Sequence, residues 1–183
     1  MYRAFALDLL HEFTQTESLR KHAYAVESAM RAYAKKYEED EDLWGCVGLI
    51  HDFDYEKYPE EHPTKGSEVL AERGVNEEIR TTILGHADFT GVPRTTLMAK
   101  ALYAVDELCG FITAVTLVRP TKSVSDVKVK SVKKKLKDKN FAAKVNREEI
   151  RKGPEELGVD FDEHILFVVT AMSGVAESLG LNP

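Results

Sequence analysis

The sequence predicts an all-α protein that folds as a single domain. Apolar residues recur at helical spacing along almost the whole chain, and no segment alternates polar and apolar residues as a half-buried strand would. The 43% hydrophobic and 31% charged residues are ordinary for a globular protein. A chain of 183 residues is long enough for one hydrophobic core and too short for two. No internal repeat or low-complexity linker divides the chain. We therefore expect one helical bundle over residues 1–183.

Apolar spacing defines the helices expected in the N-terminal part. The first covers residues 5–13, and a second begins at Ser18, whose hydroxyl suits an N-cap. The inward face of this second helix contains His22 among apolar residues. After an acidic connector at 38–42, residues 43–52 form a helix that is apolar nearly all round and therefore central.

Capping and turn residues delimit the next elements. A short helix is expected at 63–74, because proline favours a first turn and glycine a C-terminal end. The asparagine that opens 76–84 can cap another helix. A long apolar helix then runs from Thr95 or Thr96 to about Val118.

The last third contains three further helical patterns. A basic helix is expected at 125–139. Asn146 opens a variant capping box and a short helix that ends near residues 153–154. The final helix begins at Asp160, and its apolar face extends to Val175.

Compartment and membrane association follow from the cysteines and the N-terminus. Cys46 and Cys109 lie in apolar helical stretches and do not form a secreted disulfide framework. Charge interrupts residues 1–8 too early for a signal peptide, and no apolar run approaches the ~20 residues of a membrane span. We expect a cytoplasmic protein without a membrane partner.

The net charge of −6 hides a basic segment. Residues 119–152 contain thirteen lysines and arginines against four acidic residues, a local charge of +9. Such a segment either meets an anion or is a solvated helix surface. Phe141 is its one aromatic residue, which argues against a nucleic-acid partner. Whether the chain forms a homo-oligomer stays open.

An adjacent histidine and aspartate, His51 and Asp52, close the apolar run 44–50. Neighbouring helical residues diverge by ~100°, so the pair can share one ligand only if the helix ends there. Asp106 lies in the interior of an apolar helix, where a carboxylate needs a cation, a salt bridge or a helix end to cap. Imidazoles and carboxylates together suit a divalent transition metal.

The order of these residues resembles the HD superfamily of metal-dependent phosphohydrolases, in particular small stand-alone prokaryotic HD proteins of the HDIG type. The pattern His, His-Asp, His, His, Asp covers about residues 18–120, with 121–183 as a helical extension. The resemblance implies metal ligands at six positions, with Asp52 shared between two ions: His22, His51, Asp52, His62, His86 and Asp106. The alternative for His62 and His86 is a pair of loop histidines that cap helices or bind phosphate.

Part of the pattern resembles the HD-GYP branch, which cleaves cyclic dinucleotides. Gly85 stands where that branch has a second adjacent histidine, and Val92 replaces the tyrosine of Gly-Tyr-Pro. We therefore expect neither a third metal nor cleavage of cyclic dinucleotides.

The expected function is hydrolysis of a phosphate ester of a small, nucleotide-like substrate by a metal-activated water. His51 and Asp52 would be catalytic, with one or two ions of Mn, Fe, Co, Ni or Zn, or Mg. Lys57, Arg119 and Lys122 are the candidates for binding substrate phosphate. Three acidic residues near the ligands in sequence could orient water or protonate the leaving group: Asp54, Glu56 and Asp88.

Two other functions fit the same ligands. One is a di-iron oxygenase, and the other is a non-catalytic metal-containing binding or regulatory module. His11 and His164 fit no part of the pattern, and we expect them to be structural or exposed.

Overall fold

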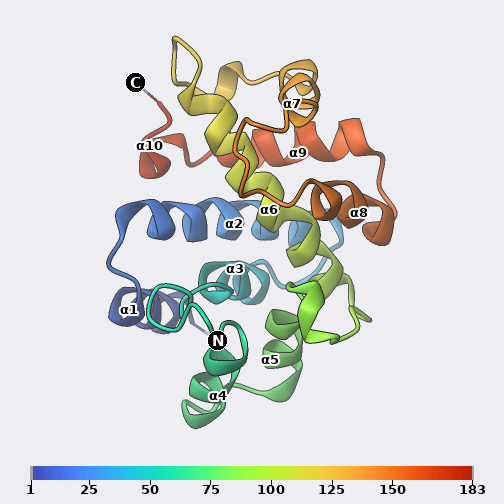
Figure 1. Cartoon of the computed structure of the whole chain (residues 1–183). Coiled ribbons are helices and arrows are strands. Elements are labelled where there is room, and N and C mark those ends of the chain that lie inside the picture. Colours follow the sequence, from blue (N-terminus) through green and yellow to red (C-terminus); the bar gives the residue numbers. More distant parts are fainter. Residues whose placement is uncertain (1, 183) are drawn as a thin grey trace.

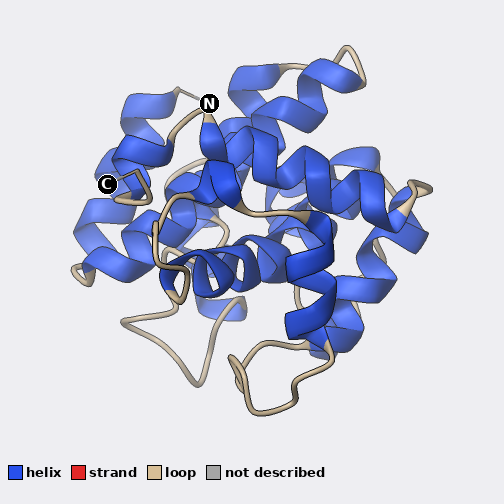
Figure 2. Ribbon diagram, turned by 90° about the horizontal axis from the view of Figure 1, so that it is seen from above, coloured by secondary structure: helices blue, strands red, loops and turns tan. Residues whose placement is uncertain are grey.

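The computed structural model describes residues 2–182, which form helices and no strands (Figure 2). Met1 and Pro183, the ends of the predicted domain, lie outside the described residues. The helices are α1 (Arg3–Phe13), α2 (Glu17–Lys36), α3 (Glu41–Ile50), α4 (Thr64–Glu72), α5 (Glu77–Leu84), α6 (Leu97–Leu117), α7 (Val129–Leu136), α8 (Arg147–Leu157), α9 (Phe161–Ser173) and α10 (Ala176–Leu179), with short 3-10 turns η1 (Asp88–Thr90) and η2 (Val124–Asp126). The predicted all-α class is confirmed.

Helices α2, α3 and α6 form the centre of the molecule (Figure 1). Helix α2 packs along α3 on one side and against α6 on the other, while α8 and α9 cover α6. Residues 44–50 of α3 are all buried, as their apolar character predicts. Gly48 allows the close approach of α2, since a Cβ there would lie 3.0 Å from the Val26 carbonyl oxygen.

Two predicted N-termini are wrong by a few residues. Helix α2 begins at Glu17 after an N-cap at Thr16, so Ser18 lies inside its first turn. Helix α3 begins at Glu41, because the Asp40 carboxylate accepts hydrogen bonds from two backbone N–H groups of the first turn. Part of the expected acidic connector is therefore helical.

The predicted starts of α5 and α6 are confirmed by their caps. The Asn76 side chain accepts a bond from the Ile79 N–H at 3.0 Å, and the Thr96 hydroxyl accepts one from the Ala99 N–H at 3.1 Å. Gly74 follows the end of α4 with a positive φ of 78°.

The C-terminal third differs most from expectation. The basic helix is only Val129–Leu136, and α8 continues through Gly153 and Pro154 to Leu157. Gly153 lies against α6, where a Cβ would be 2.6 Å from the Ala104 Cα. Helix α9 ends at Ser173, so Val175 is not on its face.

Residues 121–182 of the predicted helical extension pack on the helices of the predicted HD core. The buried His164 ring of α9 bonds to the Tyr33 hydroxyl of α2 and to the Ala104 carbonyl of α6. That residues 18–120 form the functional core remains a prediction.

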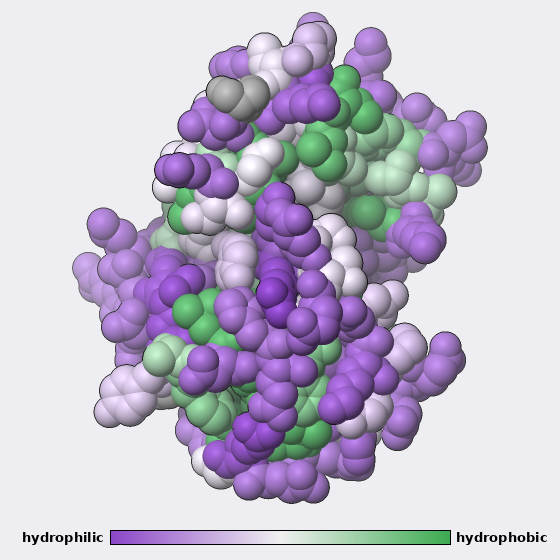
Figure 3. All heavy atoms as spheres, turned by 90° about the vertical axis from the view of Figure 1, so that its left-hand side faces the viewer, coloured by the Kyte–Doolittle hydropathy of each residue, from purple (hydrophilic) through white to green (hydrophobic). Residues whose placement is uncertain are grey.

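The face of the molecule drawn in Figure 3 is mainly hydrophilic. Figure 3 shows one face, on which apolar patches lie in the upper and lower halves among hydrophilic side chains. Within residues 2–182, no helix has both the length and the apolar character to cross a membrane.

Candidate metal centre

Six side chains from five separate segments meet beside the central helices. Helices α2 and α6 contribute His22 and Asp106, and the turn after α3 contributes His51 and Asp52. His62 precedes α4 and His86 follows α5. The structure therefore brings together all six predicted ligands, in two groups that share Asp52.

The first group contains His22, His51, Asp52 and Asp106, whose ligand atoms all lie within 4.8 Å of one another. Asp106 Oδ1 lies 2.9 Å from His22 Nε2 and 3.2 Å from His51 Nε2. Asp52 Oδ2 lies 3.4 Å from His51 Nε2. Because α3 ends at Ile50, both members of the His-Asp pair turn toward the same point.

The second group lies on the other oxygen of the shared carboxylate. Asp52 Oδ1 is 3.2 Å from His62 Nε2 and 3.2 Å from His86 Nε2. The two oxygens of Asp52 thus face different sets of imidazoles.

Backbone carbonyls fix the tautomers of two ligand histidines. His51 Nδ1 lies 2.7 Å from the Gly48 carbonyl oxygen, and His86 Nδ1 bonds to the Ile83 carbonyl. A carbonyl can only accept, so each Nδ1–H donates and each Nε2 faces the centre. Metal-binding histidines are held in this way.

Asp54 holds the third histidine of the centre. Its Oδ1 accepts from His62 Nδ1 at 2.7 Å, and its Oδ2 accepts from the Gly66 N–H at 2.7 Å. Gly66 permits this approach, since a Cβ there would lie 2.6 Å from Asp54 Cγ. Asp54 is fully buried, so it positions His62 instead of orienting water in the cavity, as the sequence suggested it could.

The centre combines burial with strong mutual charge effects. Burial opposes a charge on His51, but the carboxylates of Asp52 and Asp106 outweigh it and raise its pKa. The same balance, with hydrogen bonds to Asp52 and Asp54, raises the pKa of His62 to about 9. Despite burial, His51 holds the pKa values of Asp52 and Asp106 below the usual range.

The donor set fits a divalent metal. His62 Nε2 and His86 Nε2 lie 3.3 Å apart, although each ring has its Nδ1 directed at an acceptor. When a metal takes the place of the proton on His62, both Nε2 atoms direct lone pairs at the same point, and the cation there satisfies both. Imidazole nitrogens with carboxylate oxygens suit a first-row transition metal.

A cavity of about 300 Å³ opens beside the centre. Its walls include three polar residues that were not predicted as site residues: Glu107, Asn146 and Glu149. Burial, and then the neighbouring Asp106 charge, raises the pKa of Glu107 to about 7. Glu107 Oε2 accepts from the Asn146 N–H at 3.2 Å, which ties α6 to the start of α8.

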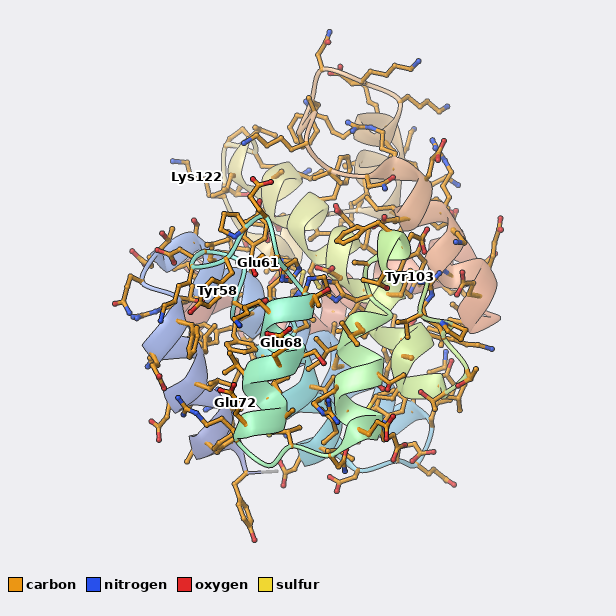
Figure 4. The ribbon with its side chains drawn as sticks, turned by 60° about the horizontal axis from the view of Figure 1, so that its bottom comes forward. Tyr58, Glu61, Glu68, Glu72, Tyr103 and Lys122 are labelled. Carbon is orange, nitrogen blue, oxygen red and sulfur yellow. The ribbon has the colours of Figure 1, made fainter. Side chains whose placement is uncertain are left out.

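The structure does not bring the predicted phosphate-binding residues to this cavity. Lys57, Arg119 and Lys122 are absent from its walls. Lys57 Nζ lies 4.5 Å from the centre of the Phe13 ring, and Arg119 reaches Ser131. Lys122 is exposed and extends outward at the edge of the molecule (Figure 4). Helix α6 carries its last residues ~16 Å from Asp106, so closeness in sequence was misleading.

Two other acidic candidates serve the fold. Glu56 accepts from the Gln15 and Thr16 N–H groups at the start of α2. Asp88 forms ion pairs with Arg94 and Lys152, the latter from the basic segment. Neither contributes to the walls of the cavity.

The remaining two histidines lie outside the centre, as expected. His11 is exposed and bonds to the Tyr24 hydroxyl, and His164 is buried between helices.

The family model of the HD domain matches residues 19–110, which is half of the chain and includes all six ligands. The chain belongs to the HD domain family. HD domain proteins are generally metal-dependent phosphohydrolases. Neither a curated protein nor a solved structure matches this HD domain protein significantly.

Proposed function

We propose that this HD domain protein hydrolyses a phosphate ester of a small substrate with the help of one or two divalent metal ions. The observation that supports it is the position of Asp52, with one oxygen toward each group of histidines. A bound divalent metal supplies Lewis acidity and a water nucleophile near neutral pH.

The two groups of ligands would have separate tasks. His22, His51, Asp52 and Asp106 would hold one ion, and Asp52 with His62 and His86 would hold the second. His51 and Asp52, which the sequence predicted to be catalytic, would both belong to the first of these groups. Asp54 keeps the His62 ring in the orientation that directs Nε2 inward.

The cavity walls define what kind of phosphate fits. No lysine or arginine is among the residues that line it, whereas Glu107 and Glu149 are. The charge of a substrate phosphate would therefore be met at the ligand cluster. A chain of several phosphates would face carboxylates, so we propose a substrate with a single phosphate group.

The test is a metal analysis coupled to a phosphatase screen. Protein purified without chelator, or reconstituted with Mn²⁺, Co²⁺, Ni²⁺ or Fe²⁺, should retain at least about one equivalent of metal and cleave phosphomonoesters, nucleoside monophosphates or phosphodiesters. Asp106→Ala should lose metal and turnover, and Asp126→Ala, outside the centre, should retain both. Bound metal without turnover across the panel would favour a non-catalytic binding module.

The shared carboxylate also suits a di-iron centre. Iron-loaded protein prepared without oxygen should then give a mixed-valence EPR signal on partial oxidation and consume oxygen with substrate. Turnover that proceeds equally without oxygen supports hydrolysis.

A further inference from the structure

Helix α6 contains an interior glycine, Gly110, that packing does not require. Glycine weakens a helix relative to alanine, so a helical glycine normally marks a close approach. Gly48 and Gly153 mark such approaches, because a Cβ at these positions would lie 3.0 Å and 2.6 Å from the nearest atom of the neighbouring helix. A Cβ at Gly110 would lie 3.9 Å from its nearest neighbour outside the helix, the His22 ring, so an alanine would fit. The absent side chain leaves space in front of the helix.

Gly110 lies where two neighbouring cavities share part of their lining. Gly110 and His22 line the metal cavity and also a second cavity of about 490 Å³. The second cavity lies between the first turn of α2, the C-terminal half of α6 and the segment after α9. Four leucines line it: Leu19, Leu117, Leu179 and Leu181.

One face of α6 runs through both cavities. Asp106, Gly110, Thr113 and Leu117 follow one another at helical spacing, so they share that face. It leads from a metal ligand to an apolar side chain ~16 Å away along the axis. Leu117 is 51% exposed, which leaves apolar surface available for a ligand. The charged pair Glu17 and Lys21, also in the lining, is joined at 2.7 Å.

We propose that the two cavities form one elongated substrate site: the phosphate lies at the metal centre, and a hydrocarbon group of the same ester passes Gly110 and lies among the leucines. This inference rests on the proposed phosphohydrolase function and adds the chemical class of the substrate, a phosphate ester of an apolar alcohol. The occupant is assigned as part of the substrate because the two cavities share His22 and Gly110 and lie along one face of α6, so a substituent on a phosphate at the metal centre would lead toward the leucines.

Binding of non-hydrolysable alkylphosphonates tests the proposal independently of turnover. Calorimetry would compare methyl-, butyl- and octylphosphonate on the metal-loaded protein. A buried methylene contributes about fourfold in affinity, so octylphosphonate should bind at least about tenfold more tightly than butylphosphonate.

Variants test the path. Gly110→Leu should remove the gain in affinity from butyl to octyl, and Gly110→Ala should reduce it less. Leu117→Asp, at the far end, should weaken octylphosphonate without changing methylphosphonate. Leu166→Asp replaces a leucine that is 56% exposed on α9, outside the groove, and is the matched control. Metal content is measured for each variant. Should Gly110→Leu lose metal through contact with His22, the result for Leu117→Asp decides the test.

Three results would overturn the proposal. Equal affinity for all three phosphonates would refute the elongated site and leave the phosphohydrolase function standing. Failure of every phosphonate to bind a metal-loaded protein would reject both. A dimer that Leu117→Asp dissociates would assign the groove to a second copy of the chain.

Discussion

Asp52 is the residue on which both halves of the metal centre depend. Asp52→Ala should remove most of the bound metal and the activity, because each carboxylate oxygen faces a different group of histidines. His62→Ala and His86→Ala should each lose only the second ion. Elemental analysis of the three variants, with His11→Ala as an exposed histidine control, measures this. Full metal content in His62→Ala and His86→Ala would contradict the binuclear centre.

Asp54 offers a test of ligand positioning. Its two oxygens accept from His62 Nδ1 and the Gly66 N–H, and in Asp54→Asn the amide NH₂ would face one of these donors. Loss of such a partner typically weakens metal binding 10–100-fold, so we expect ~10-fold or more for the second ion only. Metal titration by calorimetry measures it, with Asp42→Asn at the surface as the control. Equal weakening of both ions would point to general unfolding of the centre.

The candidate ligands that the structure brings together could be picked out from the sequence because some of their residue types are unusual in apolar surroundings. His51, Asp52 and Asp106 interrupt runs that are otherwise core. Asn146 and Glu149 gave no such indication, because only the packing of α8 on α6 brings them to the cavity. Arg119 was misplaced for the converse reason, since a rigid helix separates it from Asp106.

At the scale of elements, the cap of α3 matters because this helix ends at the His-Asp pair. The Asp40 carboxylate satisfies the N–H groups of Asp42 and Leu43, each at 2.9 Å. Asp40→Ala should lower the free energy of unfolding by about 1 kcal/mol, measured by urea denaturation. Lys128→Ala, at an N-cap whose side chain makes no capping bond, should change it little.

Helix α8 continues through Gly153 and Pro154, where the sequence predicted its end, and a substitution at Gly153 tests the reason. A Cβ at Gly153 would lie 2.6 Å from Ala104 Cα, so Gly153→Val should push α8 away from α6. The free energy of unfolding should fall by ~1–3 kcal/mol. Gly158→Ala is a different case, since it strains a left-handed cap with a φ of 74° and leaves the interface intact. Thermal melts should show a loss for both, with altered ligand or metal affinity only for Gly153→Val.

Helix existence was therefore more predictable than helix ends. Apolar spacing identified the central helices, and Asn76 and Thr96 located two starts through side chains that do cap. The predicted helix ends were wrong where tertiary contacts determine where a helix stops, as at Gly153, which packs against Ala104. A local stop pattern carries no information about a partner helix.

At the scale of the molecule, His164 links three helices and should make stability depend on pH. Burial lowers its pKa to about 4, from 6.5 in the unfolded chain. The unfolded state therefore binds more protons at His164 between these values, so the contribution of His164 to stability is full above pH 6.5 and falls toward pH 4 by ~3 kcal/mol.

The measurement is urea unfolding at pH 7.5, 5.5 and 4.5. His164→Gln should be less stable at pH 7.5, because the Tyr33 hydroxyl loses its partner, and should show a shallower decline on acidification. His11→Gln should follow the parent protein. An identical decline in the parent and His164→Gln would assign the pH dependence to other groups.

Because the candidate ligands are far apart along the chain, a bound metal would also stabilise the fold. Residues 22 to 106 supply the six donors from five segments, so a bound ion is a crosslink between parts of the chain that diffuse apart on unfolding. An ion at 100 times its Kd adds about 2.7 kcal/mol to stability, which corresponds to roughly 5–10 °C in Tm for a chain of this size. Calorimetric melts with and without chelator would measure this increment. The lifetime of the protein in a cell would then follow the supply of its metal.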